Sequence, residues 1–297
     1  MPRPLPRNPR FYRPRYILEA IPVFLFYGLC ALLPLDAASG LGGWLARTVG
    51  PLMGISRRAE RNLQRAMPEL DATARQRIIR GMWDNLGRVF AEYPHLSEFI
   101  TKNRLTSIGH NWITDMVAQG RGGIIISGHI ANWEMGPVLA ARLGAPMAVV
   151  YRAPNNPYVD WLIKRARLKV APMTVPKGGE GAIKLMRHLR NKGYLGILID
   201  QKLNEGIVVP FFGMDAHTTP APAEFSIRFG CPMVIARCIR RQGARFDVEI
   251  IEAKLPPMEN RTEAAAIFTR AMTTQLESWI REYPEQWLWL HNRWPKE

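Results

Sequence analysis

Cysteine is scarce in this sequence of 297 residues, and its three copies are poorly placed for a shared site. Cys30, Cys231 and Cys238 are an odd number without metal-ligand spacing, and Cys30 lies inside an apolar segment far from the other two. This pattern argues against both a disulfide framework and a zinc site. So few cysteines are compatible with the reduced surroundings of a cytoplasm.

The sequence also lacks the signatures of several other protein classes. It contains no Gly-x-Ser-x-Gly elbow, which weighs against a serine hydrolase. It shows neither zinc-finger spacing nor an RNA-recognition signature, so a nucleic-acid-binding protein has only the overall charge in its favour. We find no internal repeat, and biased composition is confined to the amino terminus.

Acidic residues are few compared with basic ones. The chain has 25 Asp and Glu against 40 Lys and Arg, a formal net charge of +15. Such an excess indicates a polyanionic partner, which can be nucleic acid, an anionic lipid or an acidic protein. Because 47% of the residues are hydrophobic, the chain has enough apolar material to form an ordered core. We expect one domain with a membrane-facing appendage.

The first 35 residues consist of a basic arm followed by an apolar run. Residues 1–15 contain no acidic residue, and their prolines make them a poor helix. The run Tyr16–Leu35 is about the length needed to cross a hydrocarbon core of roughly 30 Å. Glu19 and Pro22 weaken the hypothesis of a membrane-spanning helix. Both lie in the first third of the apolar run, where an interfacial or tilted helix tolerates them. The basic residues of the arm are Arg3, Arg7, Arg10, Arg13 and Arg15.

Two other interpretations of the apolar run are a secretory signal peptide and a buried core helix. The sequence DAASGLGG offers only a loose cleavage site, and five flanking arginines argue against a core helix. We therefore predict a basic arm at 1–15, a membrane-anchoring helix at 16–35 and a folded domain at 36–297. The positive-inside rule places the basic arm on the cytoplasmic side of the membrane.

The stretch from Ile55 to Phe90 is helical in pattern and rich in arginine. One interpretation is contact with the headgroups of an anionic membrane surface, where each cation contributes about 1 kcal/mol. The other is an ordinary solvated helix face. The arginines are Arg57, Arg58, Arg61, Arg65, Arg75, Arg77, Arg80 and Arg88.

The centre of the chain alternates between short apolar runs and longer stretches of helical pattern. We predict strands at 123–127, 147–151, 194–199, 233–239 and 246–251, and helices at about 132–143, 158–169, 179–191 and 263–282. Strands that alternate with helices favour an α/β fold with a mixed, largely parallel sheet flanked by helices.

Candidate catalytic residues follow the first of these strands. In SGHIANWEMG, His129 is separated from Glu134 by four residues. On one unbroken helix the two side chains would stand about 140° apart and could not meet. If His129 instead lies on the turn and the helix begins near Asn132, the imidazole could fold back to the carboxylate. Such a histidine could take a proton from a hydroxyl while Glu134 fixes its tautomer. A capping or core role is the alternative.

Several segments resemble known acyltransferases. SGHIANWEMG resembles the His-x4-Asp/Glu motif of glycerolipid and lipid A acyltransferases. YRAPNNPYVD, from Tyr151 to Asp160, and the stretch from Gly196 to Val234 resemble further blocks of the late acyltransferases of lipid A biosynthesis, the lauroyl and myristoyl transferase family. NLQRAMPEL and NLGRVFAEY fit the upstream region, so the likeness covers most of the chain from about residue 62 to 294.

This resemblance implies an O-acyltransferase of lipopolysaccharide biosynthesis, with residues 36–297 as its acyltransferase domain. The enzyme would move a fatty acyl group from an acyl carrier protein thioester to a hydroxyl of a lipid A precursor. It would work at the cytoplasmic face of a bacterial inner membrane, and neither a metal nor another cofactor is expected. Nucleic acid is not expected as a partner. Related enzymes with the same blocks acylate other membrane glycolipids or lysophospholipids, so the acceptor stays open.

The resemblance also suggests roles for single residues. His129 would be the general base and Glu134 its charged partner. Arg152 would stabilise the tetrahedral oxyanion or bind a phosphate of the acceptor, although it can also be a surface cation. Asn132 would contribute a second donor, or would cap a helix. Asp200 and Gln201 close a strand, where sheet proteins place ligand contacts, and would bind the acceptor.

Two alternatives remain open at this point. The chain could be a lipid-binding scaffold that keeps the fold without catalysis. The carboxy-terminal WLWLHNRWP, residues 287–295, could lie at a membrane interface or pack on the sheet.

Overall fold

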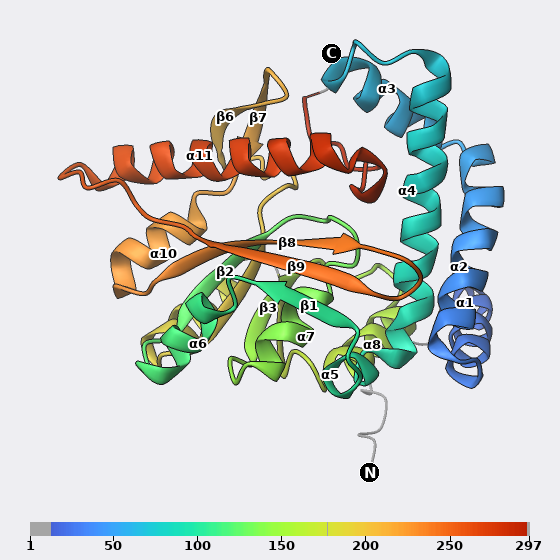
Figure 1. The fold of residues 1–297 in the computed structure, drawn as a ribbon, viewed down its shortest axis with the longest axis horizontal. Helices are drawn as coiled ribbons and strands as arrows, with labels where there is room; N and C mark the ends of the chain where they lie inside the picture. Colours follow the sequence, from blue (N-terminus) through green and yellow to red (C-terminus); the bar gives the residue numbers. More distant parts are fainter. Residues whose placement is uncertain (1–12, 177, 296–297) are drawn as a thin grey trace.

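A seven-stranded sheet forms the centre of the fold (Figure 1). The computed structural model describes residues 13–176 and 178–295. The strands lie in the order β1-β9-β8-β2-β5-β3-β4, and all neighbouring pairs are parallel except β8 with β9. They are β1 (Leu105–Ile108), β2 (Gly123–Ser127), β3 (Met147–Tyr151), β4 (Met173–Pro176), β5 (Tyr194–Leu198), β8 (Met233–Arg240) and β9 (Phe246–Glu252). A separate hairpin pairs β6 (Ile207–Phe211) with β7 (Met214–Thr218).

Helices lie on both sides of the sheet. In Figure 1, α11 crosses above β8 and β9, while α6, α7 and α8 lie below them. The helices are α1 (Pro14–Leu32), α2 (Leu35–Val49), α3 (Ser56–Ala66), α4 (Ala72–Glu92), α5 (Glu98–Thr101), α6 (Asn111–Ala118), α7 (Met135–Arg142), α8 (Pro157–Arg167), α9 (Gly179–Arg190), α10 (Ala221–Phe229) and α11 (Arg261–Glu282). Short 3-10 turns are η2 (Gly50–Leu52), η3 (Tyr93–His95) and η4 (Pro284–Gln286). The α/β class with a mixed, largely parallel sheet is confirmed.

The helical stretch predicted for 55–90 is two helices rather than one. α3 ends at Ala66, and α4 begins at Ala72 after a segment that contains Pro68. Asp71 caps α4, because its side chain accepts a hydrogen bond of 2.7 Å from the backbone N–H of Ala74. The predicted helix at 132–143 is also shorter, since α7 begins only at Met135.

α1 corresponds to the predicted anchor. It runs from Pro14 to Leu32, contains Pro22, and is long and apolar enough to cross a membrane. Seven of its large hydrophobic side chains are exposed, so most of its apolar surface is not used inside the protein: Ile17, Leu18, Ile21, Val23, Leu25, Leu29 and Leu32. Its contacts to the rest of the fold include a stacked pair of Phe24 with Trp161 of α8. α1 is thus a candidate membrane anchor. Arg3, Arg7 and Arg10 of the predicted basic arm lie outside the described residues.

α2 was not predicted, and glycines explain its packing. It runs beside α4, with Gly42 against Gly87. A Cβ atom added to either glycine would overlap the backbone carbonyl oxygen of the other. The two backbones therefore approach more closely than any larger residues would permit. Tertiary packing selects residues here that have poor helix propensity.

This close approach makes a testable prediction for Gly87→Ala. The added methyl group would force α2 and α4 apart, so we expect the free energy of unfolding to fall by about 1–3 kcal/mol. Chemical unfolding in detergent, followed by tryptophan fluorescence, measures the change. Gly40→Ala on α2 is the control, because a Cβ there meets nothing within 4 Å and should be neutral or slightly stabilising. Equal stability of the two variants would contradict the packing argument.

The carboxy-terminal segment packs inside the protein. Trp287, Trp289 and Trp294 are 1%, 0% and 4% exposed, and they surround the side chains of Phe211 and Phe212. Of the two interpretations of WLWLHNRWP, packing on the fold is the one that the structure bears out.

Candidate active site

Strand register brings His129 beside Asp200. Ser127 at the end of β2 pairs with Leu198 at the end of the neighbouring β5. A polar residue follows two positions after each of them, His129 after β2 and Asp200 after β5, both at the carboxyl end of the sheet. The Nδ1 atom of His129 lies 2.8 Å from Oδ1 of Asp200, and the backbone N–H of His129 donates to Oδ2 at 2.6 Å.

These contacts define the tautomer of His129. A carboxylate only accepts hydrogen bonds, so Nδ1 carries a proton toward Asp200. The other ring nitrogen, Nε2, lies 3.1 Å from the amide nitrogen of Gln201, which donates. Nε2 therefore presents a lone pair, which is the state required of a general base. The side chain of His129 is 13% exposed, so it is sheltered but reachable.

Asp200 is held as a buried carboxylate. It is 1% exposed, and Oδ2 also accepts a hydrogen bond of 2.8 Å from the indole N–H of Trp287. Burial alone would raise the pKa of Asp200, but the charge of His129, the hydrogen bonds it donates and the charge of His291 hold that pKa below its ordinary value. The carboxylate is thus stabilised in the charged form that would balance an imidazolium.

Glu134 does not meet the ring of His129, so the geometric expectation was wrong on this point. Its carboxylate, which is 2% exposed, forms a two-pronged ion pair with Arg167 of α8 and accepts a hydrogen bond of 2.8 Å from the Tyr93 hydroxyl. The reason is the position of the turn. α7 begins at Met135, so Glu134 stands at the helix start and points toward α8, while the end of β5 supplies the carboxylate that His129 contacts.

The ion pair controls the charge of Glu134. Burial would raise the pKa of Glu134, but the adjacent Arg167 guanidinium and the hydrogen bonds around it keep that pKa below its ordinary value. Burial, together with the nearby Glu134 carboxylate, raises the pKa of Tyr93, so the Tyr93 hydroxyl stays protonated and donates. Glu134 is therefore an anion neutralised by Arg167.

Asn132 is committed to the protein rather than to a ligand. It is fully buried, its amide donates to Glu92 at 2.7 Å, and its carbonyl oxygen accepts the backbone N–H of Glu134 at 3.0 Å. It does not line the pocket that contains His129. Its expected role as a substrate donor is therefore not supported, and its side chain acts instead on the turn before α7, which is close to the capping alternative.

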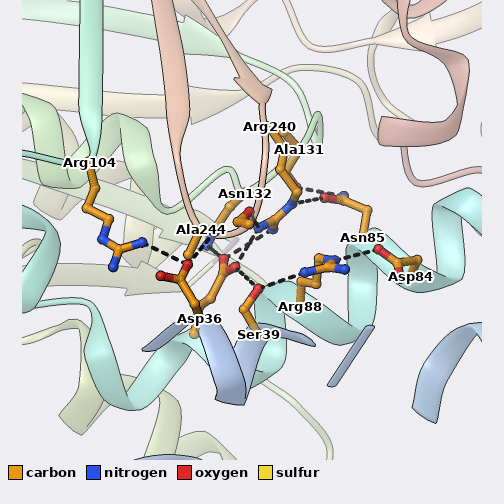
Figure 2. A network of polar contacts seen from close by, with 12 residues as sticks. Asp36, Ser39, Asp84, Asn85, Arg88, Arg104, Ala131, Asn132, Arg240 and Ala244 are labelled. Atoms are coloured by element: carbon orange, nitrogen blue, oxygen red, sulfur yellow. Dashed lines mark hydrogen bonds and ion pairs between the residues drawn. The ribbon is translucent and has the colours of Figure 1, made fainter. Parts of the chain in front are cut away.

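A buried polar network supports the turn that follows His129 (Figure 2). Its centre is Glu92, which is fully buried and accepts hydrogen bonds from Ser39 of α2, Asn132 and the guanidinium of Arg240. Arg240 also donates to Asn85 of α4 at 2.9 Å. The network therefore joins α2, α4 and β8 to the loop between His129 and Glu134.

The same network supports an uncommon backbone conformation. Ala131 has a φ of +49°, in the left-handed region that residues other than glycine seldom adopt. Its carbonyl oxygen accepts a hydrogen bond of 2.9 Å from Asn85, and its N–H donates to the carbonyl of Gln286 at 2.8 Å. These bonds hold the loop in the conformation that directs His129 and Glu134 to different partners.

His129 opens into a cavity of about 430 Å³ at the carboxyl ends of the parallel strands. Arg152 and Gln201, two of the predicted substrate-binding residues, line it as well. Asp200 lies behind His129 and is not part of the wall. Thr219, Ala221 and Phe225 also line the cavity. The structure thus places Arg152, Gln201 and His129 around one space.

Sequence reasoning missed several residues of this site. The ring of His291 lies 4.9 Å from that of His129, and its Nε2 is 3.3 Å from the Gln201 amide nitrogen. The ring of Trp133 lies 5.1 Å from His129, and Arg167 also lines the cavity. Trp133 lies inside the motif and could have been noticed. His291 and Arg167 are distant in sequence, so nothing but the fold brings them in.

These features define an α/β protein with a hydrogen-bonded His129–Asp200 pair at the carboxyl ends of two parallel strands and a candidate membrane helix near its amino terminus. The family model described as bacterial lipid A biosynthesis acyltransferase matches residues 5–296. The chain therefore belongs to this family and is an O-acyltransferase of the lipid A biosynthesis type.

Individual relatives are similar along most of their length. The lipid A biosynthesis lauroyltransferase of Escherichia coli is 26% identical, with 94% of this chain and 92% of the relative covered. The palmitoleoyltransferase of the same organism is 24% identical, with 95% and 92% covered. The phosphatidylinositol mannoside acyltransferase of Mycolicibacterium smegmatis is 23% identical, with 90% and 88% covered.

Proposed function

We propose that this enzyme transfers a fatty acyl group from an acyl carrier protein thioester to a hydroxyl group of a lipid A precursor. The observation that carries the proposal is the geometry of His129, which lines the cavity with an Nε2 that carries no proton while Asp200 holds Nδ1. Membership of the family and the names of the relatives support a lipid A precursor as the acyl acceptor.

The chemistry follows from the two ring nitrogens of His129. Nε2 removes the proton of the acceptor hydroxyl, and the oxygen attacks the thioester carbonyl carbon. The resulting imidazolium is stabilised by the buried Asp200 carboxylate. Collapse of the tetrahedral intermediate breaks the carbon–sulfur bond, the thiolate takes the proton back from Nε2, and an ester and a free thiol result.

The two arginines of the cavity have different roles in this proposal. Arg152 is exposed on the wall and is the cation that stabilises the oxyanion or binds a phosphate of the acceptor. Arg167 is neutralised by Glu134, so this pair shapes the wall rather than attracting anions. Glu134 thereby supports catalysis through Arg167 and Tyr93, not through His129. Gln201 marks the position where the acceptor hydroxyl would approach Nε2.

The proposed location is the inner membrane of a bacterium. α1, which overlaps most of the predicted segment 16–35, is the proposed anchor, and residues 36–297 are the proposed acyltransferase domain on the cytoplasmic side. The net charge of +15 favours an anionic membrane surface as a partner over nucleic acid, because exposed apolar residues accompany the arginines.

A second candidate acceptor is another membrane glycolipid or a lysophospholipid. The similarity to a phosphatidylinositol mannoside acyltransferase is the reason to test a mannosylated glycolipid as an acceptor. A lipid-binding scaffold without catalysis is the non-enzymatic alternative, and the intact His129–Asp200 pair argues against it.

The test is acyl transfer by the full chain purified in detergent. Labelled acyl carrier protein is the donor, a tetra-acylated lipid A precursor is one acceptor, and a mannosylated phosphatidylinositol is the other. Mass spectrometry should detect one added acyl ester on the lipid A precursor. An ester on the mannoside alone would reassign the acceptor, whereas no ester on either would contradict the proposal.

A further inference from the structure

A second and larger cavity lies along α4, apart from the site of His129. It is a groove of about 760 Å³ formed by α2, α4, the β8–β9 hairpin and η4. It shares no lining residue with the cavity of His129. Two acidic residues, Asp84 and Glu285, line the groove together with six arginines. These arginines are Arg47, Arg77, Arg80, Arg88, Arg240 and Arg241, and we call the site the arginine groove.

Four of these arginines already have carboxylate partners. Arg47 and Arg88 share Asp84, at 2.8 and 2.5 Å, and Figure 2 shows Asp84 with Arg88 at the edge of the polar network. Arg240 pairs with the buried Glu92, and Arg241 pairs with Asp247 at 2.6 Å. Within the groove, one carboxylate thus serves two guanidinium groups, which leaves positive charge uncompensated.

Arg77 and Arg80 differ from the other four. Both are exposed on α4, and neither has a side-chain partner in the part of the chain that the structure describes. They are three positions apart, so their side chains are neighbours on one helix face. Two adjacent free guanidinium groups present several N–H donors to one anion, and arginine binds phosphate in this forked geometry.

The groove borders an exposed apolar surface. Trp44, Leu45, Val49 and Leu52 on α2 and the turn after it are 54%, 41%, 48% and 84% exposed. Trp44 is three positions before Arg47, so an apolar side chain and a wall of the groove are neighbours on the same flank of α2. α2 follows α1 directly and contacts it, so the fold places this apolar surface on the helix next to the candidate membrane anchor.

We propose that the arginine groove binds the phosphate of an anionic lipid headgroup, with Arg77 and Arg80 as its principal contacts. The apolar flank of α2 would lie among the acyl chains at the membrane surface while the groove holds the phosphate beside it. The ligand is a phosphodiester lipid and not the acyl acceptor, because the groove is separate from His129. The inference rests on the membrane location given under Proposed function and needs no catalysis.

The experiment is calorimetric titration of the full chain in neutral detergent with monomeric dihexanoyl phosphatidylglycerol. Dihexanoyl phosphatidylcholine, which has no net charge, and inorganic phosphate are titrated in parallel. We expect Arg77→Glu/Arg80→Glu to weaken phosphatidylglycerol binding by about thirtyfold or more, since each cation near an anionic headgroup contributes appreciably. Arg77→Gln/Arg80→Gln, which adds no repulsion, should weaken it less but in the same direction.

The matched control is Arg261→Glu/Arg270→Glu on α11. Both residues are exposed, have no partner among the described residues and lie outside the groove, and the charge change is the same. Phosphatidylglycerol should bind this variant as it binds wild type. Circular dichroism verifies that all variants fold.

Several results would overturn the proposal. If wild type and Arg77→Glu/Arg80→Glu bound phosphatidylglycerol equally well, Arg77 and Arg80 would not contact the lipid. Equal affinity for phosphatidylcholine would show that the negative charge of the lipid is not recognised. Equal affinity for inorganic phosphate would identify free phosphate as the ligand. Acyl carrier protein is titrated in the same way. If it bound and phosphatidylglycerol did not, and if the groove variants lost that binding, the groove would be a protein-docking site. Because no acyl transfer is measured, each outcome is independent of whether the proposed reaction is correct.

Discussion

His129→Ala is expected to lower the rate of acyl transfer by about 10²- to 10⁴-fold, the range that positioned general bases contribute. The substitution removes the nitrogen that faces the cavity and leaves Gln201 and Arg152 in place. Substrate binding should therefore change less than kcat. The rate is measured with labelled acyl carrier protein at saturating acceptor, so that kcat and KM can be separated.

Two further variants keep this result interpretable. His129→Gln retains a polar side chain beside the buried Asp200, and it should be as inactive as His129→Ala while folding more securely. His110→Ala is the matched control, since His110 is an exposed histidine at the start of α6. Transfer within a few fold of wild type by both His129 variants would remove His129 from the chemistry.

Arg167→Met is expected to cause a large loss of stability. The change leaves the buried Glu134 carboxylate with the Tyr93 hydroxyl but without its guanidinium. Breaking a buried ion pair on one side costs about 3–5 kcal/mol, because the remaining charge has no compensation. The free energy of unfolding in detergent should fall by this amount.

The neighbouring Arg165 on the same helix provides the control. Arg165 is exposed and lies over the Trp161 ring at 5.4 Å, so Arg165→Met should cost about 0.5–1 kcal/mol. Replacing both partners, as Glu134→Gln/Arg167→Met, should be less harmful than Arg167→Met alone, because no buried charge remains. If Arg167→Met were no more destabilising than Arg165→Met, the ion pair would not be structurally important.

Five of the seven strands of the central sheet were predicted, whereas the four-residue edge strands β1 and β4 were missed. GIIIS and MAVVY are short apolar runs with clear boundaries, and β2 and β3 have the predicted limits. α2 could not be predicted from LDAASGLGGWLARTV, since glycine is a poor helix former. Gly42 is required there only because α4 packs against it. That requirement is a property of the folded pair of helices.

The β6–β7 hairpin was missed for a different reason. Its two-residue loop consists of Phe212 and Gly213, both with positive φ, at +53° and +72°. Such a turn normally has asparagine or aspartate at the first position, so phenylalanine hides the signal. Phe212 is held there by tertiary contacts: its ring packs against Trp287 and Trp289, and its backbone N–H donates to Glu277.

The site itself was predictable in part. His129 stood out as a histidine at the end of a buried strand, and Asp200 and Gln201 were recognised as closing another strand. Their contact depends on β2 and β5 being neighbours in register, although 71 residues separate His129 from Asp200. Local spacing suggested Glu134 instead, because one sequence cannot reveal which strands pair. The partner of Glu134, Arg167, was hidden for the same reason.

Asp200→Asn tests the central claim most directly, namely that Asp200 is the carboxylate that supports His129 as the base. Asparagine keeps the size of the side chain but removes its negative charge. It also replaces one carboxylate oxygen by an NH2 group, which cannot accept the hydrogen bonds that His129 and Trp287 donate to Asp200. Single-turnover transfer from labelled acyl carrier protein, expressed per folded molecule, should fall by about 10²- to 10⁴-fold. A rate within a few fold of wild type would contradict the account.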